Sequence, residues 1–207
     1  MVSMTFDIVV VGTSLGGLQA LTVMLAGLPN TFPAAVVVVQ HRHKASDNTL
    51  SFFLQQYSTL PVAEAEDKEE ILPRRVYLAP ADYHLLVEPR QAWGHRQGRY
   101  GGIATLALST EAPVCNARPS IDVLFESAAD AYAQRVIGVI LTGASQDGAK
   151  GLAKIKARGG RAIVQEPATA ESRIMPEAAI ASVTVDWIVQ LQDIAPLLVN
   201  LCQSAVR

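Results

Sequence analysis

Residues 9–17 read Val-Val-Val-Gly-Thr-Ser-Leu-Gly-Gly, and this stretch decides the fold. An apolar run ends in a glycine-hinged turn at Gly12, and Gly17 starts a segment with helical periodicity. A strand, turn and helix of this kind is typical of a parallel sheet, where the turn either cradles a phosphate or exposes a nucleophile. Ser14 lies in the turn and is therefore the first candidate for a functional residue.

Three interpretations of Ser14 differ in what the turn does. A dinucleotide-binding turn needs glycine at its middle position so that the backbone can approach the pyrophosphate, and Ser14 occupies that position. Residues 12–16 instead fit Gly-x-Ser-x-Gly, the sharp turn that holds a serine hydroxyl clear of the sheet. The third interpretation is that Ser14 only caps the following helix, a common role for serine. Taken alone, the turn favours the helix cap.

Apolar, β-rich runs alternate with segments of helical periodicity along most of the chain. The runs at 6–11, 35–40, 136–141 and 161–164 precede predicted helices at 17–25, 47–56, 149–157 and 176–181, and a last helix is expected at 193–202. This alternation predicts an α/β fold: a doubly wound, mainly parallel sheet with helices on both faces. A further helix is expected after Ser120, with that serine as its cap.

Residues 62–110 break the alternation. Short β-rich runs at 76–79, 84–87 and 104–108 are separated by Pro, Gly and polar turns. This pattern predicts a β-hairpin or meander excursion at one edge of the sheet, with residues 91–102 as its mobile tip. No linker interrupts the chain, so residues 1–207 are expected to form a single domain.

Composition and charge argue against several classes of protein. The 207 residues carry a net charge of −2 and no long Lys/Arg run, so nucleic acid is not an expected partner. No apolar run approaches the ~20 residues of a membrane span, and no membrane insertion is expected. The N-terminus lacks the pattern of a secretory signal, which predicts a cytoplasmic protein. Cys115 and Cys202 are far apart in the sequence, so no metal site is expected from them. The expected partner is a small molecule or another protein.

Three reactive side chains follow the ends of predicted strands, where parallel sheets bind their ligands. Ser14 follows the first strand, His41 follows the second, and Asp147 lies in the polar turn after 136–141. A serine hydroxyl needs an imidazole to take its proton, and the imidazole needs an acceptor that fixes its tautomer. The three residues can therefore serve as nucleophile, base and acid if their strands are neighbours.

Structural interpretations exist for the other two residues as well. His41 can simply close its strand, and with His43 it hints at a metal site, although no third ligand stands out. Asp147 can cap the helix that begins near Gly148. Nucleotide binding is disfavoured at the second strand, because the acidic residue that normally holds the ribose is replaced by Gln40 and His41.

Blocks of sequence spread over nearly the whole chain resemble one known family. They lie at residues 11–17, 39–41, 66–69, 77–80, 118–125, 139–143, 147–149 and 175–180. In this order the blocks are similar to the catalytic domain of CheB-type protein-glutamate methylesterases, which remove methyl groups from bacterial chemoreceptors. The resemblance implies a doubly wound α/β fold and a catalytic triad of Ser14, His41 and Asp147. It also implies that γ-glutamyl methyl esters on the cytoplasmic helices of methylated chemoreceptors are hydrolysed to release methanol, with glutamine deamidation as a second reaction.

The resemblance extends to the residues around the triad. By position, it implies that the backbone amides of Leu15 and Ala144 hold the oxyanion, and it implies no cofactor. Residues of the matching blocks that are expected to bind the substrate are Thr13, Gln40, Arg118, Ser120 and Met175.

The chain departs from the family pattern at several places. Leu15 replaces the threonine that commonly follows the nucleophile, Arg42 and His43 replace a Met-Pro pair, and residues 144–146 read Ala-Ser-Gln instead of Met-Gly-Asn. Most members also carry an N-terminal phosphoacceptor receiver domain. Because the first strand starts near Phe6, we expect no such domain here and a separate regulatory protein in its place. A catalytically weak or inactive receptor-binding scaffold of the same fold and a nucleotide-binding domain are the alternatives.

Overall fold

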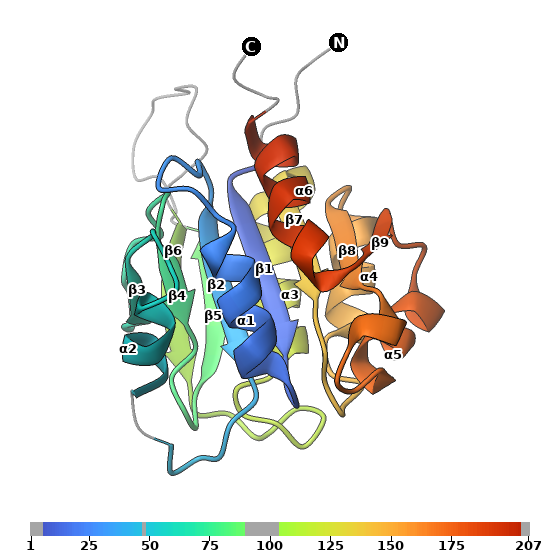
Figure 1. The fold of residues 1–207 in the computed structure, drawn as a ribbon. Coiled ribbons are helices and arrows are strands. Elements are labelled where there is room, and N and C mark those ends of the chain that lie inside the picture. The colour runs from blue at the N-terminus through green and yellow to red at the C-terminus, as the bar shows by residue number, and fades with distance from the viewer. Residues whose placement is uncertain (1–5, 47–48, 90–103, 204–207) are drawn as a thin grey trace.

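A computed structural model describes residues 6–46, 49–89 and 104–203 of the chain. Its centre is a seven-stranded sheet in which every pair of neighbouring strands is parallel, in the order β3-β4-β2-β1-β7-β8-β9 (Figure 1). The strands are β1 (Ile8–Thr13), β2 (Ala35–Gln40), β3 (Val62–Glu64), β4 (Val76–Leu78), β7 (Val136–Ile140), β8 (Arg161–Gln165) and β9 (Trp187–Val189).

Helices cover both faces of this sheet. They are α1 (Gly17–Ala26), α2 (Thr49–Gln55), α3 (Ile121–Tyr132), α4 (Ala149–Ala157), α5 (Ile174–Ser182) and α6 (Leu191–Gln203), with short 3₁₀ turns η1 (Ala133–Arg135) and η2 (Pro167–Thr169). In Figure 1, α1 and α6 lie in front of the sheet and α3 lies behind it. Buried residues of α1, α2 and α6 belong to one apolar cluster, and those of α3, α4 and α5 belong to the other.

Strand β1 shows why its sequence is apolar without interruption. Ile8 and Val10 face the cluster that contains α3, whereas Val9 and Val11 face the cluster that contains α1. A strand covered on both faces has no solvent side, so alternation of apolar and polar residues disappears. The predicted doubly wound α/β fold, with helices on both faces, is confirmed.

The β excursion is smaller than predicted. Among the residues that the structure describes in this region, β5 (His84–Pro89) and β6 (Ala104–Ser109) form an antiparallel hairpin, which packs on α3 as a separate two-stranded sheet. The run expected at 76–79 is strand β4 of the main sheet, where residues 76–78 are buried between β2 and β3. The assignment of this run to the excursion was wrong, because three residues are too few to show on which sheet a strand lies. The predicted tip at 91–102 lies outside the described residues.

Strands β3 and β9, each three residues long, were not predicted. Both lie at the edges of the main sheet, where the strands are short and none of their residues is fully buried. Within the described ranges, no helix is long and apolar enough to cross a membrane.

The strand order places the three predicted reactive residues together. The chain runs from β1 to β2 on one side, and later enters β7 on the other side of β1, so the order reverses at β1. Ligands of open parallel sheets bind at such a point, beyond the carboxyl ends of the strands. The loops there are tied by backbone hydrogen bonds: Ser14 donates to the Thr142 carbonyl at 3.0 Å, and His41 donates to the Thr13 carbonyl at 3.0 Å.

Candidate active site

The turn after β1 presents Ser14 at the edge of the sheet. Helix α1 begins at Gly17, with Gly16 as its N-cap in the left-handed region at φ 78°. Ser14 therefore lies outside the helix, and the interpretation of Ser14 as the cap is wrong. Its side chain is half-buried and makes no hydrogen bond to any other described residue. The hydroxyl is free to meet a ligand.

His41 and Asp147, the predicted base and acid, are in hydrogen-bond contact. The Nε2 atom of His41 lies 2.8 Å from Oδ2 of Asp147, whose side chain is fully buried. In a neutral ring that donates from Nε2, the lone pair is on Nδ1. Asp147 therefore selects the tautomer in which Nδ1 is the nitrogen able to accept a proton.

Asp147 is held by four donors. Besides His41, its carboxylate accepts hydrogen bonds from the Ser120 hydroxyl at 2.8 Å and from the backbone amides of Ile121 at 2.7 Å and Asp122 at 3.0 Å. Burial alone would raise the pKa of Asp147, but the hydrogen bonds from His41, the two amides and Ser120 together hold it below its usual value. The carboxylate stays ionised, which is the state that stabilises a charged imidazole.

The same hydrogen bonds make Asp147 the cap of helix α3. Ser120 occupies the N-cap position of this helix, yet its side chain makes no capping bond and points to Asp147 instead. The prediction that Ser120 caps the helix was therefore wrong. Asp147 does cap a helix, but this helix is α3 and not the one after Gly148. A carboxylate at a helix N-terminus is stabilised by the helix dipole as well as by the free amides.

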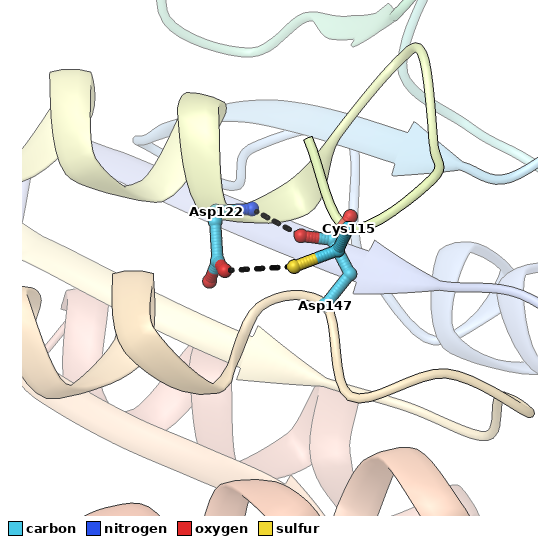
Figure 2. A group of neighbouring side chains, drawn as sticks. All are labelled: Cys115, Asp122 and Asp147. Atoms are coloured by element: carbon cyan, nitrogen blue, oxygen red, sulfur yellow. Dashed lines mark hydrogen bonds between the residues drawn. The ribbon is translucent and has the colours of Figure 1, made fainter. Parts of the chain in front are cut away.

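A second carboxylate supports the first. Figure 2 shows Asp122 beside Asp147, with Cys115 next to both. Asp122 Oδ1 accepts hydrogen bonds from the amides of Gly148 at 2.9 Å and Gly151 at 2.8 Å, and Cys115 Sγ lies 3.8 Å from Asp122 Oδ2. Burial raises the pKa of Asp122. Asp122 thus ties the start of α3 to the start of α4 below the triad.

The cluster of Cys115, Asp122 and Asp147 is compact enough to suggest a metal site, since one ligand atom from each lies within 4.8 Å of the others. However, both oxygens of Asp147 already accept two hydrogen bonds each. These donors use the lone pairs that a cation would need, so the donor set does not fit a metal ion. His43, the other metal candidate, accepts a hydrogen bond from the Ala45 amide at its Nδ1.

The loop after β7 lies beside Ser14. A side-chain carbon at Gly143 would lie 3.0 Å from the Ser14 Cβ and 2.6 Å from the Met175 Cε, so the loop after β7 packs directly against the nucleophile turn. Within the described residues, neither the Leu15 amide nor the Ala144 amide donates a hydrogen bond. Free amides beside a nucleophile are suited to bind a developing oxyanion.

The residues expected to bind substrate divide into two groups. Thr13, Ser120 and Met175 are buried, and they hold the loops of the site in place from inside the protein. Thr13, for example, donates from its hydroxyl to the Thr142 carbonyl at 2.8 Å. Gln40 and Arg118, by contrast, line cavities at the surface.

Gln40 and Arg118 also fix the loops around the site. Gln40 Nε2 donates to the carbonyls of Ser14 at 2.9 Å and His41 at 2.8 Å, which holds the two loops together. Its Oε1 atom is buried without a partner among the described residues. Arg118 pairs with Asp82 at 2.6 Å.

Three cavities meet at His41. The nucleophile cavity, about 540 Å³, is lined by residues 14–19, Gln40, His41 and Glu171. The apolar cavity, about 600 Å³, is lined by Leu18 of α1 and Phe53 of α2. The basic cavity, about 360 Å³, is lined by residues 41–44, Asp82, Asn116, Arg118 and neighbouring residues. Together they form a surface on which a protein segment can lie across the triad.

Sequence reasoning missed Glu171, Leu18 and Phe53 as residues of this surface. Leu18 and Phe53 appear in the sequence as ordinary apolar residues of helices, and their exposed fractions of 44% and 37% arise only from the tertiary packing. Glu171 belongs to a loop after β8, and nothing in its local sequence signals that it meets the turn after β1.

Known proteins are similar to this chain over nearly its whole length. The family model described as CheB methylesterase matches residues 9–198. A putative protein-glutamate methylesterase/protein-glutamine glutaminase of Leptospira interrogans serovar copenhageni is 42% identical over 201 residues, which cover 97% of each chain. A protein-glutamate methylesterase/protein-glutamine glutaminase of Moorella thermoacetica is 37% identical over 200 residues, which are 96% of this chain and 45% of that protein.

A solved structure is similar over almost the whole chain. The crystal structure of the Thermotoga maritima CheB methylesterase catalytic domain superposes with a TM-score of 0.86 at 35% sequence identity. The match covers 95% of this chain and 99% of that domain.

Proposed function

The chain belongs to the CheB methylesterase family, and from this premise we propose that Ser14, His41 and Asp147 catalyse hydrolysis of γ-glutamyl methyl esters in a chemoreceptor. Its relatives carry the names protein-glutamate methylesterase and protein-glutamine glutaminase, so the chain is a hydrolase of protein side chains. The observation that supports the triad most directly is the 2.8 Å contact between His41 and the buried Asp147, beside the cavity that Ser14 lines.

The acylation step follows from the tautomer of His41. Its Nδ1 atom takes the proton of Ser14 as the Ser14 Oγ attacks the ester carbonyl, and the C–O bond to methanol breaks after the imidazolium returns that proton to the leaving oxygen. Asp147 stays ionised throughout and stabilises the imidazolium through the Nε2–H bond. A glutamyl ester of Ser14 and methanol are the products of this step.

Deacylation uses the same groups. His41 Nδ1 takes a proton from water, the hydroxide attacks the glutamyl ester, and the Ser14 oxygen leaves with the proton that His41 returns. Hydrolysis of a glutamine side chain follows the same path, with ammonia as the leaving group in place of methanol.

The oxyanion of each tetrahedral intermediate requires donors near Ser14. The unpaired amides of Leu15 and Ala144 are the donors that we propose for this role, because the turn after β1 and the loop after β7 meet at Ser14. Both donors belong to the backbone, so the replacements at these two positions leave the proposed oxyanion hole in place.

The substrate lies on cytoplasmic helices of the receptor, so the cytoplasm is the proposed location of the reaction. Control by a separate regulatory protein remains a prediction, and the rim of the three cavities is the surface at which such a protein would compete with the receptor.

Methanol release from a methylated receptor fragment tests this function. Wild-type protein is expected to release methanol, Ser14→Ala is expected to release none above background, and Ser182→Ala serves as a matched control because Ser182 is exposed on α5. A serine-directed phosphonate should label Ser14 in the wild type. Full activity of Ser14→Ala would overturn the nucleophile assignment, and an unlabelled, inactive wild type would indicate a binding scaffold.

A further inference from the structure

A carboxylate that the mechanism does not use stands beside the nucleophile. Glu171 lies in the loop between η2 and α5, and it lines the nucleophile cavity together with Ser14 and His41. A side-chain carbon at Gly16 would lie 2.6 Å from Glu171 Oε2, which places the carboxylate against the turn two residues after Ser14. A substrate that acylates Ser14 must pass close to this charge.

The Glu171 carboxylate has no partner of its own. Its side chain is exposed, and within the described part of the chain it makes no hydrogen bond and no ion pair. The nearby Glu177, in contrast, pairs with Arg173 at 3.9 Å. The charge of Glu171 is therefore available to a ligand, and no cation among the described residues neutralises it.

The basic cavity, which His41 also lines, has different charges. Arg42, Lys44 and Arg118 line the basic cavity, where Arg42 pairs with Glu64 and Arg118 pairs with Asp82. A protein segment that crosses the triad thus meets the carboxylate of Glu171 in the nucleophile cavity and the ammonium group of Lys44 in the basic cavity. Electrostatic complementarity of this kind selects partners more than it strengthens binding.

We propose that Glu171 is a specificity-determining residue that favours substrate segments with a lysine or arginine near the modified glutamate. The inference rests on the proposed esterase function and adds the chemical class of the flanking residue. The ester itself is neutral, and any effect of the Glu171 charge on the oxyanion is the same for all substrates, so a ratio between two substrates reports only its effect on the flanking residue. An exposed ion pair contributes about 0.2–1 kcal/mol, which corresponds to a preference of up to about five-fold.

A helix-stabilising role for Glu171 is the competing explanation, because its carboxylate lies at the N-terminus of α1. That role predicts a lower melting temperature for any neutral variant and an equal effect on all substrates. A role in specificity predicts a change in the ratio between substrates. The ratio therefore separates the two explanations.

The experiment uses helical peptides that contain one glutamate γ-methyl ester and carry either Lys or Glu four residues before and after it. These positions lie on the same face of a helix as the ester. The measured quantity is the ratio of kcat/KM for the Lys peptide to kcat/KM for the Glu peptide, at low salt and at high salt. In the wild type we expect a ratio above one that falls as salt screens the charges.

Variants test whether Glu171 causes this preference. Glu171→Gln should lower the ratio by up to about five-fold, and Glu171→Lys should lower it further and below one. Glu177→Gln removes the same charge from the exposed face of α5 and should leave the ratio unchanged. An equal ratio in the wild type and in Glu171→Lys would overturn the inference, whereas the proposed function would fail separately if the wild type cleaved neither peptide.

Discussion

The two ends of the proposed triad are built in opposite ways. Asp147 is fully buried and accepts four hydrogen bonds from two loops and a helix N-terminus. Ser14 is half-buried, its hydroxyl makes no hydrogen bond within the described residues, and the next side chain, Leu15, is 53% exposed. The difference indicates that the fold immobilises Asp147 and His41, while the Ser14 hydroxyl is left free to meet a ligand. Contacts of a nucleophile commonly tighten only when the substrate binds.

Among the variants that test this difference between Asp147 and Ser14, Asp147→Asn is expected to have the largest effect. An amide in place of the carboxylate places an NH₂ donor where other donors need an acceptor, so His41 loses its preferred tautomer. We expect kcat to fall by about 10⁴, the loss seen when the triad aspartate of a serine protease is replaced by asparagine. The loss of charge-assisted bonds in a buried site should also cost about 2–3 kcal/mol of unfolding free energy. Methanol release and urea denaturation measure the two effects.

Ser14→Ala is the comparison variant, since it should abolish activity with little change in the free energy of unfolding. If Asp147→Asn were as stable as Ser14→Ala, the acid end would not be the structural anchor that its hydrogen bonds indicate.

Ser120→Ala should give the next largest effect. The variant removes one of four donors to Asp147 and leaves the two helix amides and His41 in place. We expect a loss of about 1.5–3 kcal/mol in unfolding free energy and a drop of about ten-fold in kcat. Thermal unfolding and esterase kinetics on this variant, with the surface substitution Ser182→Ala as the reference, check both values. A variant that keeps full stability would contradict the role of Ser120 in holding the acid.

The pH dependence of stability sharpens the comparison between the two buried carboxylates. The pKa of Asp147 is lowered, so its stabilising contribution is present above the unfolded-state pKa and is lost as the pH falls through the lower, folded-state value. The pKa of Asp122 is raised, mainly by burial, so the folded state is relatively favoured at low pH and loses stability as the pH rises through the folded-state value.

Unfolding free energies of Asp147→Asn and Asp122→Asn, measured relative to wild type between about pH 3 and pH 7, report these opposite signs. The deficit of Asp147→Asn should grow as the pH rises, and the deficit of Asp122→Asn should shrink. If the stability deficits of the two variants changed with pH in the same direction, the opposite pKa shifts of Asp147 and Asp122 would be ruled out.

The smallest effect is expected at the exposed end, from Leu15→Thr. The hydroxyl adds one donor beside Ser14, and a net hydrogen bond in the transition state corresponds to a rise in kcat of roughly two- to five-fold. The free energy of unfolding should stay within about 0.5 kcal/mol of wild type, because Leu15 is exposed. Kinetics on the receptor fragment and urea denaturation serve as the measurements. A large loss of stability would show that Leu15 has a packing role.

Residues close in sequence allowed the strongest predictions. The strand, turn and helix around Ser14, the strand before His41 and the strand before Asp147 were all assigned from local periodicity, and the observed elements agree within about two residues. The carboxyl ends of parallel strands share one edge of a sheet, so the three side chains could be expected at one place. The same reasoning assigned β4 to the wrong sheet, because three residues show a strand but not its neighbours.

Local sequence by itself determined the α/β class, the positions of Ser14, His41 and Asp147 at strand ends, and the glycine turn that exposes the nucleophile. The tertiary structure decided what these residues touch. Asp147 caps a helix that begins 26 residues earlier in the chain, and Glu171 meets a turn more than 150 residues away. Such contacts depend on how strands order themselves and how helices pack across the sheet, which is a property of the whole chain and leaves no periodic signal at either residue.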